Sequence, residues 1–77
     1  MEIKVLGTGC SKCKATYETV NRVVTEHKVN ATVEKVEDIM EIMKYNVISM
    51  PAIVIDGKVV VSGKTPSESE IIKLLGL

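Results

Sequence analysis

The sequence lacks the aromatic residues on which nucleic-acid bases commonly stack. It has no tryptophan and no phenylalanine, and its only aromatic residues are Tyr17 and Tyr45. Ten basic residues balance ten acidic ones, so no net charge attracts a polyanion. Proteins that hold single strands combine a basic groove with aromatic stacking. We therefore expect neither nucleic acid nor an anionic membrane as a partner.

Long hydrophobic runs are missing as well. No apolar stretch approaches the roughly 18 residues of a membrane-spanning helix, and no basic segment followed by an apolar run begins the chain. The composition, 45% hydrophobic and 26% charged, is that of a chain that folds. Because 77 residues support only one core, we expect a single domain over residues 1–77. With no secretion or membrane segment in view, we expect a cytoplasmic protein, and we expect it to be a monomer.

Cysteine is scarce, and the two cysteines lie three positions apart, at Cys10 and Cys13. A bridge over so short a loop constrains the unfolded chain far less than a long-range disulfide does. A purely structural bridge is therefore disfavoured. The CxxC spacing instead indicates redox chemistry or the binding of a soft metal ion.

Apolar periodicity in the first half predicts a strand, a helix and a second strand. The first strand carries Ile3, Val5 and Leu6 and stops at Gly7-Thr8-Gly9. An amphipathic helix follows from Ser11, and its apolar stripe is expected to hold Cys13, Tyr17, Val20, Val24 and His27, with Val23 beside them. The second strand, over 29–36, contains charged residues and is expected at an edge of the sheet.

A short helix is predicted after the second strand. Asp38 is its expected N-cap, and Glu41 stands three residues on, as in a reciprocal capping arrangement. Met40 and Met43 are interpreted as core filler.

A hairpin and a last helix complete the chain. Two apolar runs, 51–55 and 58–61, flank Asp56-Gly57, a dipeptide that supplies the positive φ angles of a two-residue turn. In the last helix Thr65 is the expected N-cap, with Pro66 first and Glu68 third. The order βαβαββα predicts an α/β fold with a mixed four-stranded sheet covered by helices.

The placement of the cysteines predicts a reactive pair. Cys10 stands at the start of a helix, where unpaired backbone N–H groups and the helix dipole favour thiolate over thiol. Lys12 and Lys14 add positive charge, and together these effects lower the pKa of Cys10. Cys13 lies one turn further on, where its sulfur can displace a partner from Cys10. Cys10 is therefore the predicted nucleophile and Cys13 the resolving thiol, with no metal or organic cofactor.

The run Gly7-Thr8-Gly9-Cys10-Ser11-Lys12-Cys13-Lys14 between a strand and a helix, with Met50-Pro51 before a later strand, resembles the thioredoxin superfamily. It is most similar to the small glutaredoxin-sized redox-active disulfide proteins of bacteria and archaea. The resemblance implies a thioredoxin-like fold and a cis Pro51 beside the active-site disulfide. It also implies a substrate site formed by Met50, Pro51, Ser11 and Lys12. The implied partners are a disulfide-containing protein substrate and a disulfide reductase.

The sequence departs from that family pattern at several positions. Ser11-Lys12 stands where thioredoxins have Gly-Pro, and no tryptophan precedes the cysteines. An ungapped match puts Lys4 where thioredoxins hold the buried acid that helps to deprotonate the resolving cysteine. The segment 62–65 lacks the acid with which glutaredoxins hold glutathione. What activates Cys13 is therefore open, and a dedicated glutathione site is not expected.

Two other functions remain possible at this stage. Heavy-metal-associated domains also place CxxC between a first strand and helix and carry Cu(I) or Zn, but they end in a strand, whereas this chain is predicted to end in a helix. The pair could alternatively serve a redox-sensing interaction module without turnover. His27, about four turns from the cysteines, is interpreted as structural.

Overall fold

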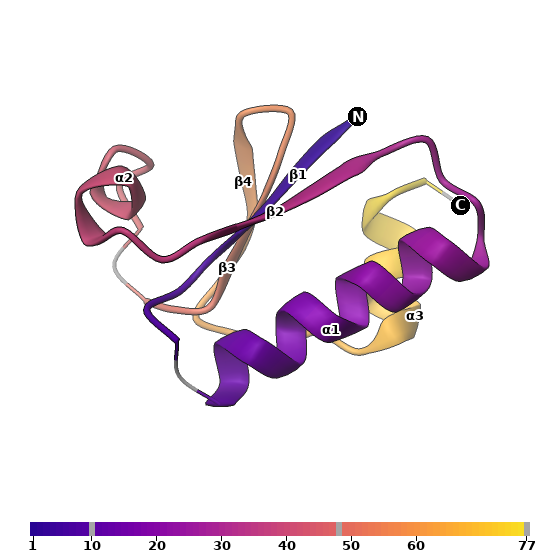
Figure 1. The fold of residues 1–77 in the computed structure, drawn as a ribbon, viewed down its shortest axis with the longest axis horizontal. Coiled ribbons are helices and arrows are strands. Elements are labelled where there is room, and N and C mark those ends of the chain that lie inside the picture. The colour runs from indigo at the N-terminus through magenta and orange to yellow at the C-terminus, as the bar shows by residue number, and fades with distance from the viewer. Residues whose placement is uncertain (10, 48, 77) are drawn as a thin grey trace.

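The computed structural model describes residues 1–9, 11–47 and 49–76. Its elements follow one another in the predicted order (Figure 1). They are β1 (Glu2–Leu6), α1 (Ser11–Glu26), β2 (Thr32–Val36), α2 (Ile39–Met43), β3 (Ala52–Ile55), β4 (Lys58–Ser62) and α3 (Glu68–Leu74). Among the described residues, no helix has the length and apolarity to cross a membrane.

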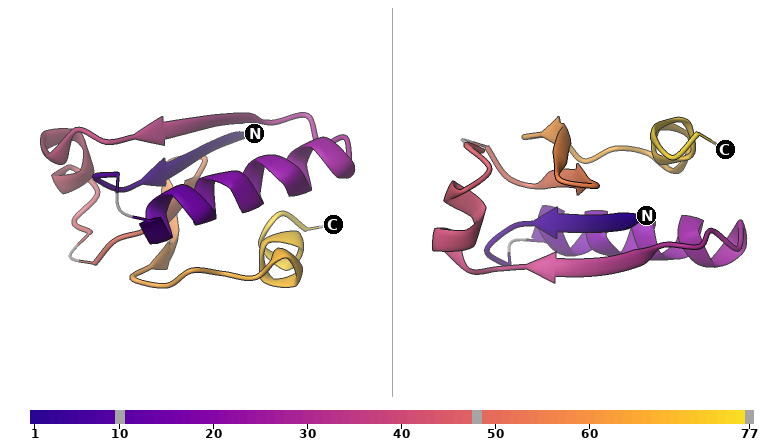
Figure 2. Two further views of the ribbon diagram at one scale, coloured as in Figure 1. Left: turned by 60° about the horizontal axis from the view of Figure 1, so that its bottom comes forward. Right: turned by 90° about the horizontal axis from the view of Figure 1, so that it is seen from above.

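The four strands form one mixed sheet in the order β2-β1-β3-β4. β1 pairs with β2 in parallel and with β3 in antiparallel fashion, and β4 runs antiparallel to β3. The α/β fold with a mixed four-stranded sheet is thereby confirmed, with β2 at an edge as expected. The two views of Figure 2 show α1 and α3 side by side, while α2 lies at the end of the sheet where β1 stops.

Side chains alternate between the two faces of a strand, and the core accordingly divides into two clusters. The first lies between the sheet and the helices α1 and α3, and its buried members are Ile3, Val5, Val20, Val23, Ile53, Ile71 and Leu75. The second lies on the α2 side, and its buried members are Leu6, Ile42, Ala52 and Val54. The two inner strands, β1 and β3, therefore contribute to both clusters.

The hairpin between β3 and β4 forms at the predicted dipeptide. Asp56 and Gly57 have φ angles of 49° and 83°, as a two-residue turn of this kind requires. The Asp56 side chain also accepts a hydrogen bond from the backbone N–H of Glu2 at 2.8 Å. The turn is thereby tied to the beginning of β1.

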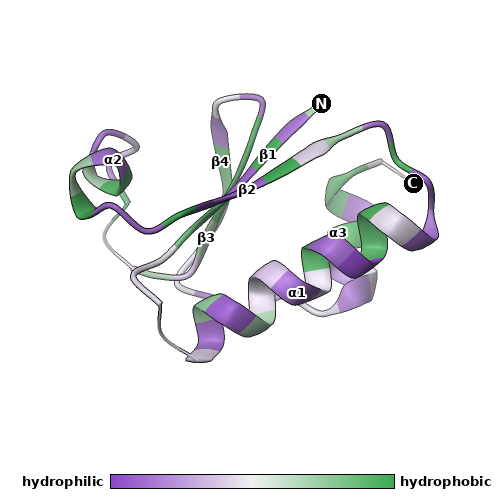
Figure 3. Cartoon of the chain, in the orientation of Figure 1, coloured by the Kyte–Doolittle hydropathy of each residue, from purple (hydrophilic) through white to green (hydrophobic). Residues whose placement is uncertain are grey.

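The exposed face of α2 differs from the prediction that its methionines fill the core. Met40 and Met43 are 67% and 62% exposed, and of the helix only Ile42 is buried. Figure 3 shows that hydrophobic residues nevertheless form part of this short helix. Five residues make little more than one turn, so a single side chain can face the sheet. Asp38 is the N-cap as predicted, but Glu41 pairs with Lys44 at 3.0 Å.

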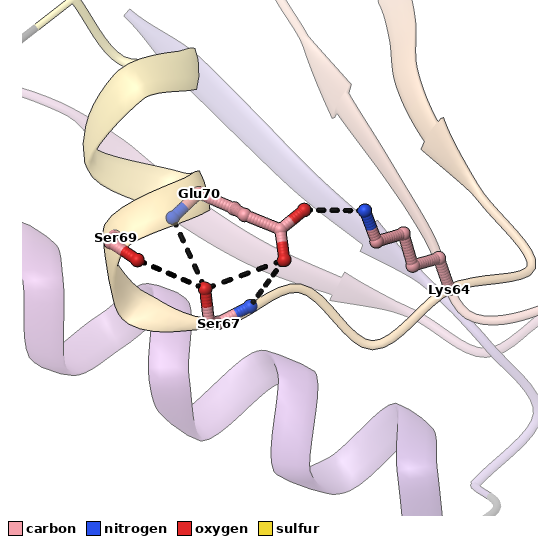
Figure 4. A network of polar contacts seen from close by, with 4 residues as sticks. All are labelled: Lys64, Ser67, Ser69 and Glu70. Carbon is pink, nitrogen blue, oxygen red and sulfur yellow. Dashed lines mark hydrogen bonds and ion pairs between the residues drawn. The ribbon is translucent and has the colours of Figure 1, made fainter.

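The last helix begins later than predicted. Its N-cap is Ser67 instead of Thr65, and the acid that closes the capping box is Glu70 instead of Glu68. Figure 4 shows the Ser67 side chain and the backbone N–H of Ser67 bonded to Glu70, with Lys64 paired to the same carboxylate. Two capping boxes are possible in this segment, Thr65 with Glu68 and Ser67 with Glu70. The chain forms the second, in which Ile71 is buried in the core.

The buried face of α1 is rotated relative to the predicted stripe. Cys13, Thr16, Val20 and Val23 are buried, whereas Tyr17 and Val24 lie at the margin. Thr16 was not expected inside, and its hydroxyl donates to the Lys12 carbonyl at 2.9 Å, which satisfies it within the helix. His27 lies past the helix end and is exposed.

Candidate active site

The end of β1 places a glycine directly against a cysteine. Gly7 continues β1, and its N–H donates to the Val36 carbonyl at 2.9 Å. A Cβ added at Gly7 would lie 2.6 Å from the Cys13 Cβ and in collision with the Cys13 Sγ. Only a residue without a side chain therefore lets the first turn of α1 approach the sheet this closely.

Cys13 is held at this position by the packing of α1. It is 4% exposed, lies on the buried face of the helix and is disulfide-bonded. Cys10, the predicted nucleophile, lies outside the described residues, so the pairing of the two sulfurs stays a proposal. The placement of Cys13 in the first turn agrees with the predicted helix start at Ser11.

Pro51 lies at the same end of the sheet. Leu6 pairs with Ala52 in the last pair of β1 and β3, and Gly7 and Pro51 are the chain neighbours of these two residues. The Met50–Pro51 peptide bond is cis, the isomer that the resemblance implies. Pro51 is buried, and its carbonyl accepts a hydrogen bond from the Gly63 N–H at 2.9 Å. Gly7, Cys13 and Pro51 thus lie at the same end of the sheet.

The other predicted substrate residues differ in their exposure to solvent. Met50 is half-buried and packs against the second core cluster. Ser11 and Lys12 are exposed on the first turn of α1. Lys14 is exposed as well, and it lines a pocket beside Cys13.

That pocket, of about 160 Å³, contains two residues that the sequence pattern did not single out. Lys35 and Glu37 enter it from the end of β2, opposite Lys14 and Cys13 on α1. Their side-chain charges lie 4.0 Å apart, between Lys35 Nζ and Glu37 Oε1. Their spacing of two on a strand that runs parallel to β1 was the available signal, because it puts both on one face at the active-site end.

Lys4, at the position of the family's buried acid, does not reach this pocket. Its neighbour Val5 lines the pocket, and Lys4 points to the opposite face. There its ammonium donates to the Tyr45 hydroxyl at 3.3 Å and pairs with Glu2 at 3.3 Å. The Tyr45 hydrogen bond, followed by that of Glu2, raises the pKa of Lys4. Lys4 therefore contacts Tyr45, which follows α2, and does not belong to the candidate active site.

The electrostatics at the start of α1 favour a negative charge. The first turn of α1 has no acidic residue and carries Lys12 and Lys14. The N–H groups of a first helical turn lack intrahelical acceptors, and the helix dipole is positive there. A thiolate placed at this end is consequently stabilised.

A βαβαββα chain with CxxC before α1 and a cis-proline before β3 is a small thioredoxin-like redox protein. The family model of the thioredoxin domain matches residues 1–76, and the chain belongs to that family. A thioredoxin of Methanocaldococcus jannaschii is 42% identical over 69 residues, which are 90% of this chain and 79% of that protein. A thioredoxin of Methanothermobacter thermautotrophicus is 29% identical over 75 residues, 97% of each chain.

Proposed function

We propose that this protein is a thiol–disulfide oxidoreductase that reduces protein disulfides, with Cys10 as the nucleophile and Cys13 as the resolving thiol. The observation that carries the proposal is the burial of Cys13 in the first turn of α1, against Gly7. A buried second thiol next to an exposed helix start supports a division of roles between the two sulfurs.

The proposed cycle consists of two exchanges. The Cys10 thiolate attacks one sulfur of the substrate disulfide, and the second substrate sulfur leaves as a thiolate that takes up a proton. Cys13 then loses its proton and attacks Cys10, which releases the first substrate sulfur as a thiolate. The substrate gains two electrons and two protons and becomes a dithiol, while the protein dithiol becomes a disulfide. A disulfide reductase of the cell restores the dithiol, and no metal or organic cofactor enters the cycle.

We propose that the substrate lies across the first turn of α1 and the residue before Pro51. Ser11 and Lys12 are exposed there, and the backbone of Met50 stands at the end of the sheet, where an extended substrate segment can pair with it. The Met50 side chain is half-buried in the second core cluster, which fixes this backbone in place. Recognition through backbone groups suits a protein that acts on disulfides in many sequence contexts.

The test uses the two single variants. Dithiol-reduced wild-type protein should reduce the disulfides of insulin, followed by the turbidity of the released chain. Cys10→Ser should abolish this activity, and Cys13→Ser should stop after the first exchange as a mixed disulfide that mass spectrometry detects. Equal residual activity in the two variants would contradict the division of roles.

The same protein distinguishes the proposed enzyme from a metal carrier. Reduced wild-type protein is titrated with Zn(II) and with Cu(I) against a chromophoric chelator. Insulin reduction without stoichiometric, chelator-resistant metal binding supports the oxidoreductase. Tight metal binding together with no thiol–disulfide turnover would overturn it.

A further inference from the structure

The proposed cycle, on which the following inference rests, requires that a buried thiol lose its proton. Cys13 is 4% exposed, and burial disfavours the charged form of a thiol. The second exchange therefore needs a group that accepts the Cys13 proton as its sulfur attacks. The position at which the family places an acid is occupied by Lys4, which faces Tyr45 on the other side of the sheet.

Among its described charged residues, the pocket beside Cys13 contains one group that can accept a proton. Its described charged residues are Lys14 from α1 and Lys35 and Glu37 from the end of β2. The two lysines are cations, so the carboxylate of Glu37 is the base among them. We infer that Glu37 accepts the Cys13 proton through water in this pocket and thereby takes the role of the acid that position 4 lacks.

The backbone of the active-site turn is shaped to admit this carboxylate. A Cβ added at Gly9 would lie 3.2 Å from Glu37 Oε2, so any side chain at position 9 would crowd the carboxylate. Gly9 also has a φ of 89°, which favours glycine. Glu37 thus reaches over the turn that leads into the CxxC motif, and the pocket of about 160 Å³ has room for water between Glu37 and Cys13.

Lys35 positions the carboxylate from the same strand face. Its ammonium lies 4.0 Å from Glu37 Oε1 and 5.4 Å from the centre of the Tyr17 ring on α1. The lysine is therefore held between the helix and Glu37. A cation at this place also favours the thiolate that forms on Cys13.

The proton and electron balance of the step is simple. The Cys13 Sγ–H bond breaks, its proton passes through water to the Glu37 carboxylate, and the Sγ electron pair forms the bond to Cys10. The bond between Cys10 and the substrate sulfur breaks, and the substrate sulfur leaves with that electron pair. Glu37 then returns the proton to water or to the departing thiolate, which regenerates the carboxylate.

The test separates the two exchanges with an aromatic disulfide, 5,5′-dithiobis(2-nitrobenzoate), whose leaving thiolate needs no proton. Reduced protein releases one coloured thiolate when Cys10 attacks and a second when Cys13 resolves the mixed disulfide, so stopped flow resolves two phases. In Glu37→Gln the first phase should be unchanged, whereas the second should be about 100-fold slower near pH 7, as for loss of a general base. Glu34→Gln, which removes one carboxylate from the other face of β2, is the matched control and should leave both phases unchanged.

The pH dependence distinguishes proton transfer from a structural or purely electrostatic effect. The deficit of Glu37→Gln should be largest near pH 6 and should shrink as the pH rises, because a growing fraction of the thiol then ionises without the base. A structural defect would slow the second phase equally at every pH. A carboxylate that acted only through its charge would hinder the thiolate, so its removal would accelerate the second phase. Either of these results would overturn the inference.

A second variant keeps the test decisive. Glu37→Ala leaves space for a small carboxylate, and added formate should restore the second phase in proportion to its concentration, while chloride at equal ionic strength should not. Failure of formate to restore a slowed phase would also overturn the role of Glu37. Absence of the first phase in the wild-type protein would instead contradict the proposed function itself, so the two failures are distinguishable.

Discussion

The first turns of α1 and α3 solve the same physical problem in opposite ways. Each presents backbone N–H groups without intrahelical partners and the positive end of a helix dipole. In α3 the side chains of Ser67 and Glu70 close a capping box, and Lys64 pairs with the same carboxylate (Figure 4). The first turn of α1 has no acidic residue and instead carries Lys12 and Lys14.

This difference explains why one helix start is suited to chemistry and the other to stability. At α3 the negative charge that the helix end favours is supplied by its own side chain, and the hydrogen bonds are made internally. At α1 the first turn of the helix itself supplies no carboxylate, so its N–H groups and the dipole are left to stabilise a thiolate at this end.

Substitution of Gly7 should disrupt the start of α1 most strongly. In Gly7→Ala the new Cβ collides with the side chain of Cys13, and overpacking of this kind costs about 1–3 kcal/mol of unfolding free energy. Displacement of the Cys13 sulfur should also slow insulin reduction by about 10- to 100-fold. Urea unfolding and the turbidity assay measure the two effects on the same preparation.

Gly57→Ala is the control for loss of a glycine. Gly57 has a φ of 83° at the hairpin turn, and no atom would meet its added Cβ within 4 Å. This variant should lose about 1 kcal/mol through backbone strain and retain full activity. Full activity in Gly7→Ala as well would show that the contact between Gly7 and Cys13 does not set the position of the sulfur.

An acid placed in the first turn of α1 should make this start resemble that of α3. In Lys12→Glu the new carboxylate competes for the dipole and raises the pKa of Cys10, so attack on a test disulfide near neutral pH should slow about threefold to tenfold. Lys58→Glu, an equally exposed change at the start of β4, is the control and should react at the wild-type rate. High salt should diminish the Lys12→Glu effect, and a salt-independent effect would contradict its electrostatic origin.

The fold was predictable where local chemistry and periodicity agree. Asp56-Gly57 fixes the hairpin through φ angles that few other dipeptides adopt, and the apolar alternation of β1 fixes the centre of the sheet. The prediction failed where two arrangements had similar local signals. Thr65 and Ser67 both begin a plausible cap, and the choice of Ser67 depends on which register packs Ile71 into the core.

The site was predictable only in part, because its members come from separate segments. The proposed roles of Cys10 and Cys13 are inferred from their spacing and their place at a helix start, and Pro51 is identified through the resemblance alone. The only sequence signal for Glu37 is its spacing of two from Lys35, and the residue becomes relevant only because β2 ends beside Gly9 in the parallel pairing with β1. The methionines of α2 show the converse, since apolar character alone did not reveal that Met40 and Met43 face outward.

Removal of the cap of α3 should lower stability without touching the redox chemistry. Ser67→Ala deletes the hydroxyl that accepts from the Glu70 N–H, and loss of an N-cap costs about 1 kcal/mol. Both phases of the aromatic disulfide reaction should be unchanged. Thr65→Ala is the matched control, since Thr65 precedes the cap, and should be nearly neutral in urea unfolding. A slowed redox phase in Ser67→Ala would mean that the two helix starts are coupled.

The smallest effect should be the pH dependence of the same cap. The hydrogen bond from Lys64, and then that from the Ser67 backbone, lower the pKa of Glu70 in the folded protein. A carboxyl group whose pKa is lower in the folded than in the unfolded state adds stability above its unfolded pKa, and this stability is lost as the pH falls through the folded value. The difference in unfolding free energy between wild type and Glu70→Gln should therefore be present at neutral pH and disappear in acid. Urea midpoints measured across this range test it, with Glu18→Gln on α1 as the control for loss of one exposed carboxylate. A deficit that stayed constant into acid would show that the geometry of the capping box, and not the charge of Glu70, holds the start of α3.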